Sequence, residues 1–270
     1  MTEPYVHTSG AGPPAVLVHG TFVGGPQSFA AQAPLAEDHR LLIVDRRGYG
    51  ANPAQGETLG WPVDSEDLLR LLEELGGAHL VGHSYGGAVV AVAASRRPDL
   101  VRSLVLIEPS LNRLADDDPD VAAMLQRERG VFERAPAMSA GDWSRLWLTR
   151  VAGMPDEGAD GWMGTWGEQE WAMAEVVRRE AWAGAAPVDA DVLAAARFPK
   201  LLVVGSKAPP TATASVRAVG RALVEALVRR IGVEVVVFEG SGHLPPVEEP
   251  ERFNDLLHRA WAVPGSGGKW

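Results

Sequence analysis

Short apolar runs alternate along the chain with longer stretches in which apolar residues recur every three or four positions. The short runs are rich in Val, Leu and Ile and are almost uninterrupted by polar residues, as in strands buried on both faces of a parallel sheet. They lie at residues 15–18, 41–44, 78–81, 103–107, 201–204 and 233–238. The longer stretches predict helices at 63–75, 86–97, 214–230 and 251–262. This alternation predicts an α/β fold with a mostly parallel, doubly wound sheet.

The alternation stops between residues 111 and 187, where the chain shows helical and polar patterns without a convincing strand. We expect this stretch to form a helical lid inserted into the α/β core. The core would then consist of residues 1–110 and 188–263. The Gly/Ser-rich tail at 264–270 has the composition of a flexible segment.

Six of the nine tryptophans lie in the expected lid: Trp143, Trp147, Trp162, Trp166, Trp171 and Trp182. Indole rings at this density either build a small helical core or line an apolar substrate pocket. The pattern does not separate the two interpretations. Trp171 and Trp182 are the candidates for contact with a substrate.

Composition narrows the functions that fit this fold. A net charge of -10 argues against a nucleic-acid partner and against attachment to anionic lipid, since both need clustered basic residues. The chain has no cysteine, which excludes disulfides, thiolate metal sites and a Cys nucleophile. The first residues lack a secretory signal, and no apolar run approaches the ~20 residues of a bilayer span. We therefore expect a cytoplasmic protein without a membrane partner, and leave a homodimer open.

The most specific motif is Gly82-His83-Ser84-Tyr85-Gly86, between a predicted strand and a predicted helix. This context is typical of a nucleophile elbow, in which a serine on a strained turn exposes its hydroxyl. Side chains two residues to either side would collide with the neighbouring backbone, which explains the glycines. The backbone N–H of Tyr85, at the start of the helix, is free to hold an oxyanion. The pattern predicts Ser84 as the nucleophile, while His83 is expected to be structural.

A second Gly-rich loop follows the strand at 15–18 and contains His19, Gly20, Thr21 and Phe22. Such a loop supplies the second oxyanion donor when its backbone lies beside the nucleophile. We assign that donor to the N–H of Thr21, with Phe22 as second choice and as a candidate substrate contact. The alternative is an ordinary connection between a strand and a helix.

His243 follows the last predicted strand in a Gly-rich loop, where its imidazole can reach a serine at the same edge of the sheet. It is the predicted general base, and Leu244 beside it is a candidate substrate contact. Four other histidines, His7, His39, His79 and His258, are expected at the surface or at strand edges.

Residues 10–262 resemble the α/β-hydrolase superfamily. The resemblance lies in the order of the motifs along the chain: glycine loop, serine elbow, lid and terminal histidine. The resemblance implies an oriented Ser–His–acid triad. The usual acid is an aspartate about three residues after the glycine that ends the penultimate strand. Here that glycine is Gly205, and Ala208 occupies the expected position. The acid must therefore come from elsewhere, because an unoriented imidazole catalyses poorly.

Glu108 is the predicted replacement, because it ends the strand after the serine helix and so projects from the same edge of the sheet. Some branches of the superfamily, such as the haloalkane dehalogenases, take their acid from that position, but those use an Asp nucleophile. Two alternatives remain open. One is that Glu108 is a capping or ion-pairing residue near Arg102 or Arg113, and the other is that Asp189 or Asp191 is the acid.

The zearalenone lactonases resemble this chain further, with a serine nucleophile, a glutamate after that strand and a terminal histidine. They also share a loop similar to Gly205–Thr211. This resemblance implies hydrolysis of a macrocyclic lactone, a small hydrophobic substrate, without a metal or cofactor. One rival activity is that of a carboxylesterase or thioesterase acting on a hydrophobic acyl substrate. Another is a ligand-binding or lyase-type member of the fold that has lost hydrolysis.

Overall fold

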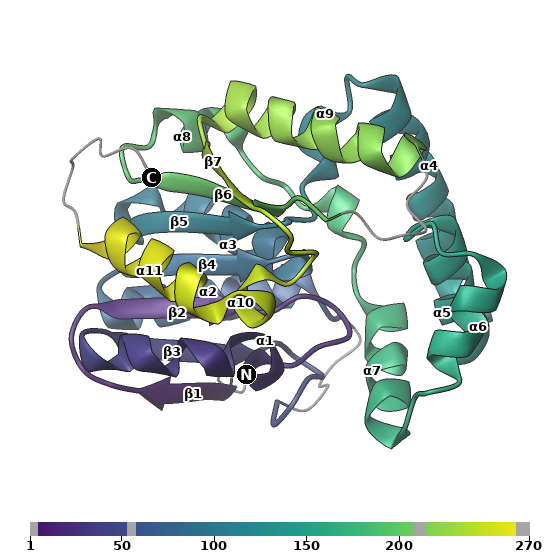
Figure 1. Cartoon of the computed structure of the whole chain (residues 1–270), viewed down its shortest axis with the longest axis horizontal. Coiled ribbons are helices and arrows are strands. Elements are labelled where there is room, and N and C mark those ends of the chain that lie inside the picture. The colour runs from purple at the N-terminus through teal and green to yellow at the C-terminus, as the bar shows by residue number, and fades with distance from the viewer. Residues whose placement is uncertain (1–4, 53–57, 208–213, 263–270) are drawn as a thin grey trace.

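A seven-stranded sheet forms the centre of the molecule (Figure 1). The computed structural model describes residues 5–52, 58–207 and 214–262. The strand order is β1-β3-β2-β4-β5-β6-β7, and β1 pairs antiparallel with β3 while the other pairs are parallel. The strands are β1 (Tyr5–Ser9), β2 (Pro14–Val18), β3 (Arg40–Asp45), β4 (Ala78–His83), β5 (Val101–Ile107), β6 (Lys200–Gly205) and β7 (Glu234–Phe238). The predicted mostly parallel α/β sheet is confirmed.

Helices cover both faces of the sheet. One face packs against α1 (Gly25–Phe29), the 3-10 helix η1 (Ala30–Glu37), α10 (Pro245–Glu248) and α11 (Pro250–Trp261). The other face packs against α2 (Trp61–Leu75), α3 (Tyr85–Arg96), α8 (Ala190–Ala195) and α9 (Ala214–Ile231). A further 3-10 turn, η2 (Pro98–Leu100), leads into β5. The four predicted helices are present, whereas β1, α1 and α8 were not predicted.

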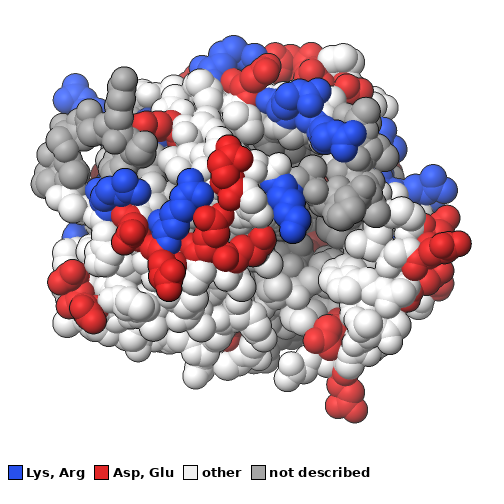
Figure 2. Space-filling model, in the orientation of Figure 1, with Lys and Arg blue, Asp and Glu red and all other residues white. Residues whose placement is uncertain are grey.

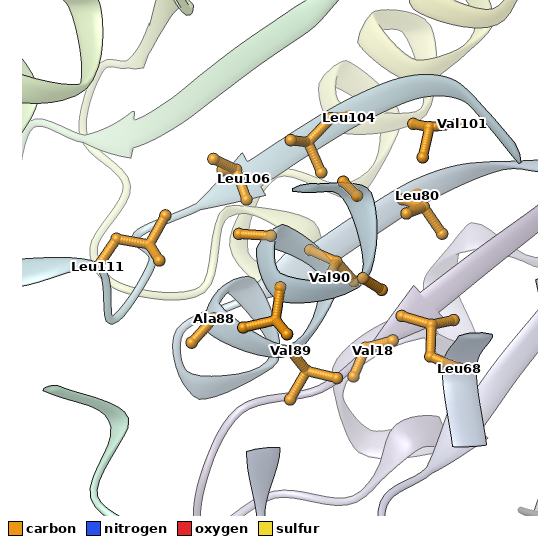
Figure 3. Close-up of a cluster of buried hydrophobic side chains, with 14 of the residues drawn as sticks. Val18, Leu68, Leu80, Ala88, Val89, Val90, Val101, Leu104, Leu106 and Leu111 are labelled. Carbon is orange, nitrogen blue, oxygen red and sulfur yellow. The ribbon is translucent and has the colours of Figure 1, made fainter. Parts of the chain in front are cut away.

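The larger core cluster lies between the sheet and α3 (Figure 3). Val18, Leu80 and Leu104 point from three neighbouring strands towards Val89 and Val90 of the helix. Nearly every residue of α3 is buried, which its small Gly, Ala and Val side chains permit. Burial of each Val or Leu side chain contributes roughly 1.5–3 kcal/mol, so this layer fixes the turn that precedes α3.

The segment between residues 111 and 187, which we call the helical insertion, contains helices and no strand, and all of it is described. It stands at the carboxyl-terminal edge of the parallel strands (Figure 1). Trp143 is fully buried and donates to the carbonyl of Val131, so this indole belongs to the insertion's own core. Its elements are η3 (Asn112–Ala115), α4 (Pro119–Arg134), η4 (Ala135–Ala137), α5 (Ala140–Arg150), α6 (Asp156–Met163), α7 (Glu168–Arg179) and η5 (Ala183–Ala185).

Two expectations fall on residues outside the described ranges, namely the tail at 264–270 and the Ala208–Thr211 part of the loop after β6. Within those ranges, none of the helices has both the length and the apolar content that a bilayer span needs.

Candidate active site

Ser84 occupies a strained turn between β4 and α3. Its backbone has φ 52° and ψ -117°, and its N–H donates to the carbonyl of Ile107 on β5 at 2.8 Å. A Cβ atom added at Gly86 would lie 2.3 Å from the carbonyl oxygen of Val18, and one at Gly82 would lie 2.6 Å from that of Gly86. Both glycines are therefore required by close backbone approach, as the motif predicted. A positive φ at a non-glycine residue in such a turn is a feature typical of functional sites.

The glycine loop after β2 lies directly against the nucleophile. A Cβ atom added at Gly20 would lie 2.9 Å from the Cβ of Ser84. Phe22 has φ 59°, so the loop turns sharply just after Thr21. Tyr85 is the first residue of α3, where backbone N–H groups have no acceptor within the helix. The structure thus brings both predicted oxyanion residues to the serine, and their roles stay predictions.

A buried arginine that the sequence analysis missed holds the oxyanion loop. The guanidinium of Arg46 donates to the carbonyls of His19 at 3.1 Å and Gly20 at 2.9 Å. It also pairs with Asp64 of α2 and with Glu180 at the end of α7. All three charged side chains are almost fully buried, so each ion pair depends on the others to offset desolvation.

The same network reaches the residue after the nucleophile. The hydroxyl of Tyr85 accepts from the N–H of Trp61 at 3.0 Å and donates to the carbonyl of Ala181 at 2.5 Å. Burial raises the pKa of Glu180 to about 7, against the opposing attraction of Arg46. The carboxyl end of the helical insertion is therefore joined to both sides of the predicted oxyanion hole.

His83, which was expected to be structural, and His19 of the oxyanion loop are both buried. Burial lowers the pKa of His83 to about 3, and burial together with Arg46 lowers that of His19 well below its usual value. His19 Nε2 accepts from the backbone N–H of Arg46 at 3.0 Å. The Nε2 atom of His83 lies 2.9 Å from the carbonyl oxygen of His243, so the neutral His83 ring supports the loop of the predicted base.

Glu108 and His243 come together at the carboxyl edge of the sheet. Oε2 of Glu108 lies 3.8 Å from Nδ1 of His243, while Oε1 accepts from the N–H of Gly205 at 2.8 Å. The distance to the ring is within ion-pair range but longer than a hydrogen bond, as is common for catalytic pairs without a bound substrate. The imidazole is 56% exposed and the carboxylate 29%, so both remain accessible to a substrate.

The alternative interpretations of Glu108 find no support in the contacts. Arg113 pairs with Asp116 at 3.3 Å, away from Glu108. Asp189 caps α8 by accepting from the N–H of Val192 at 3.0 Å. Since α8 precedes β6, Asp189 and Asp191 stand before the start of that strand, whereas Glu108 contacts Gly205 at its end.

His39 directly precedes β3 and His79 is the second residue of β4, so both lie at strand ends, one of the two expected contexts. Both side chains are buried, and both rings contact Trp261. Burial lowers the pKa of His79 to about 3. Within residues 5–52, 58–207 and 214–262, no three His, Asp or Glu side chains gather closely enough to hold a metal ion.

A pocket of about 600 Å³ opens beside the acid–base pair, between the end of β6 and the first half of α9. Glu108, Pro109 and His243 form one wall, and the apolar side chains of Leu202, Val204, Val216, Leu223 and Val224 form much of the rest. None of the four predicted substrate contacts lines it: Phe22, Trp171, Trp182 and Leu244. Phe22 instead packs against a cluster of indole rings from the insertion: Trp147, Trp162 and Trp166.

Solved structures share this arrangement of strands and helices. An esterase from Thermogutta terrifontis, with malate bound, superposes with a TM-score of 0.65 at 24% sequence identity, covering 96% of this chain and 92% of that one. Identity at this level shows a common fold.

Two of the sequence relatives that align with part of the chain are esterases. Pimeloyl-[acyl-carrier protein] methyl ester esterase from Aeromonas hydrophila is 33% identical over 119 residues, 43% of this chain and 46% of that protein. Esterase YbfF from Escherichia coli is 31% identical over 97 residues, 35% and 38% of the two chains. The chain thus matches less than half the length of each of these relatives. The model of the alpha/beta hydrolase family, by contrast, matches residues 15–256. With the fold, the serine turn and the match over residues 15–256 in agreement, the chain belongs to the alpha/beta hydrolase family.

Proposed function

We propose that this hydrolase cleaves carboxylic esters through an acyl-enzyme on Ser84. The observation that carries the proposal is the 3.8 Å approach of Glu108 to His243 at the sheet edge where the serine turn lies. A carboxylate beside Nδ1 keeps the proton on that atom and leaves Nε2 to accept a proton from the serine hydroxyl.

The chemistry follows from these positions. His243 removes the hydroxyl proton as Ser84 Oγ attacks the ester carbonyl, and the N–H groups of Thr21 and Tyr85 stabilise the oxyanion. The protonated imidazole, stabilised by Glu108, then donates its proton to the departing alcohol. A water molecule, deprotonated by His243, then attacks the acyl-enzyme carbonyl. The bond between the acyl carbon and Ser84 Oγ breaks, the acid leaves, and the imidazolium returns the proton to Oγ.

The pocket beside Glu108 is the proposed binding site for the apolar part of the substrate. Gly220 forms part of its wall in the middle of α9, and a Cβ atom there would meet nothing within 4 Å. Glycine inside a helix reduces stability by about 1 kcal/mol relative to alanine. Gly220 therefore leaves this part of the pocket open at the expense of helix stability. Filling that space with Gly220→Phe is expected to slow hydrolysis of long-chain esters more than that of acetate esters.

A lactone is the finer proposal for the substrate. Glu108 stands where the zearalenone lactonases have their acid, and Ser84 and His243 match the other two members of that triad. A lactone gives a single hydroxy-acid product heavier by one water, whereas an open ester gives two products. Mass spectrometry of the products therefore separates the lactonase from the carboxylesterase and the thioesterase.

The direct test is a screen of lactones, p-nitrophenyl esters and acyl thioesters with three proteins: the wild type, Ser84→Ala and Ser95→Ala. We expect Ser84→Ala to lower kcat by about 10³- to 10⁶-fold. Ser95 is a matched control, because it is a buried serine on α3 whose hydroxyl bonds only to the helix carbonyl of Val92. Equal turnover by wild type and Ser84→Ala would exclude the mechanism. A folded wild type inactive on all three classes would favour the ligand-binding or lyase alternative.

A further inference from the structure

The pocket beside the acid–base pair carries basic side chains on an acidic protein. The chain has a net charge of -10, yet Lys207, Arg217 and Arg221 line this pocket against the carboxylates of Glu108 and Glu225. Figure 2 shows Lys and Arg atoms gathered over α9, the helix that carries both arginines. The balance of charge at the pocket is therefore opposite to that of the whole molecule.

Two of these cations have no partner among the described residues. In the part of the chain that the structure describes, the side chains of Lys207 and Arg221 make no ion pair or hydrogen bond. Arg217 takes part in another interaction. Glu108, the carboxylate nearest the reaction, is occupied by the N–H of Gly205 and faces His243. The attraction of the two unpaired cations is thus available to a ligand.

The rest of the pocket wall is suited to a hydrocarbon chain. Leu202 and Val204 from β6 and Leu223 and Val224 from α9 line the volume of about 600 Å³. Apolar walls favour burial of methylene groups, while Lys207 and Arg221 at exposed positions favour a charged group that stays near solvent. An ester with a neutral chain would contact the apolar walls but would form no ion pair with Lys207 or Arg221.

We propose that the preferred substrate carries an aliphatic chain ending in an anionic group, a carboxylate or a phosphate, which Lys207 and Arg221 bind at the pocket. The inference rests on the proposed ester hydrolysis and names its substrate class. Arginine presents a planar pair of N–H donors that matches either anion, and lysine adds a point charge. The anionic end is remote from the reacting carbonyl, so these contacts act on substrate binding and lower KM.

The test compares esters that share one reactive group. Kinetics are measured for the monomethyl ester of a saturated dicarboxylic acid, the dimethyl ester of the same acid, and a methyl ester whose chain ends in phosphate. For the wild type we expect kcat/KM to be about three- to tenfold higher for the charged esters, the range that exposed ion pairs provide. The charged ester with the higher kcat/KM identifies the anion. Adding 0.5 M salt should reduce the ratio of kcat/KM between charged and neutral esters.

The variant that tests the site is Lys207→Gln/Arg221→Gln. It should raise KM for the charged esters about three- to tenfold and leave the dimethyl ester unchanged. The matched control is Arg40→Gln/Arg102→Gln, which removes the same charge from exposed positions near the starts of β3 and β5, at the opposite edge of the sheet. The control should retain the preference for the charged esters.

Binding separates failure of this inference from failure of ester hydrolysis. Calorimetric titration of the free dicarboxylate into Ser84→Ala, with and without the Lys207/Arg221 substitutions, needs no turnover. Binding that weakens about three- to tenfold when the cations are removed supports the anion site even if no ester is cleaved. Equal affinity in both proteins, or equal KM for neutral and charged esters, overturns the inference while leaving the serine mechanism intact.

Discussion

Gly20 is the residue of the oxyanion loop with the least room for a side chain beside the nucleophile. A methyl group there would lie 2.9 Å from Ser84 Cβ and 3.0 Å from Nδ1 of His83, closer than real contacts allow. Gly20→Ala must therefore shift the loop away from Ser84, and with it the N–H of Thr21. Since losing one oxyanion donor costs about 10²- to 10³-fold in kcat, we expect a loss approaching that size.

Gly130→Ala on α4 is the control for this prediction, because a Cβ atom there meets nothing within 4 Å and the backbone is helical. It should keep full activity and gain up to about 1 kcal/mol of stability. Circular dichroism melts and ester kinetics on both variants check the pair. Unchanged kcat in a folded Gly20→Ala protein would show that the loop is not the oxyanion donor.

Single residues differ in how far the sequence reveals them. Ser84 and His243 stand in short local motifs, a glycine-flanked turn and a loop after the last strand, which are visible without a structure. Glu108 has no motif and was found from its place at a strand end and from a family resemblance. Arg46 gave no signal, because its partner Glu180 is 134 residues away and neither lies in a recognisable pattern.

At the scale of elements, the carboxyl end of α7 is tied to the core through a crowded buried cluster. Arg46 faces two carboxylates, those of Asp64 and Glu180, and the rings of Tyr49 and Tyr85 enclose the guanidinium. One cation between two buried acids leaves an excess negative charge when both are ionised. The raised pKa of Glu180, about 7, reflects this burial.

This cluster predicts a stability change with pH. Between the ordinary pKa of a glutamate, 4.5, and about 7, folded Glu180 holds a proton that the unfolded chain releases. Stability from this group therefore falls as pH rises through that window. Glu180→Gln removes this pH dependence. The free energy of unfolding of the variant, relative to that of the wild type, should therefore rise by roughly 1–3 kcal/mol between pH 5 and pH 8. Urea unfolding at both pH values measures it, and a difference that stays constant with pH contradicts the assignment.

Elements were predicted well where burial imposes a pattern and missed where it does not. The six parallel strands are apolar because both of their faces are covered, and each was predicted within two residues at either end. The missed strand β1 has the sequence YVHTS and is exposed or half-buried throughout, so no apolar run marks it. The Pro-containing helices α1 and η1 bury only a few residues each, some of them polar, so no apolar stripe marks them either.

At the scale of the whole molecule, parallel strands bring together residues far apart in the sequence. Ser84, Glu108 and His243 follow three different strands, β4, β5 and β7, whose carboxyl ends share one edge. That convergence follows from the predicted topology. The pocket does not, because its volume depends on how far α9 stands from β6. Trp171 and Trp182 were candidates for substrate contact by composition, but the pocket beside His243 is lined by α9 instead.

The most direct test is the rate at which a fluorophosphonate modifies Ser84, followed by intact mass in the wild type, Glu108→Ala and Asp189→Ala. We expect one adduct on the wild type and on Asp189→Ala at similar rates, and a rate at least about 100-fold lower for Glu108→Ala, because an imidazole without its carboxylate activates the serine poorly. Labelling of folded Glu108→Ala at the wild-type rate would contradict the account.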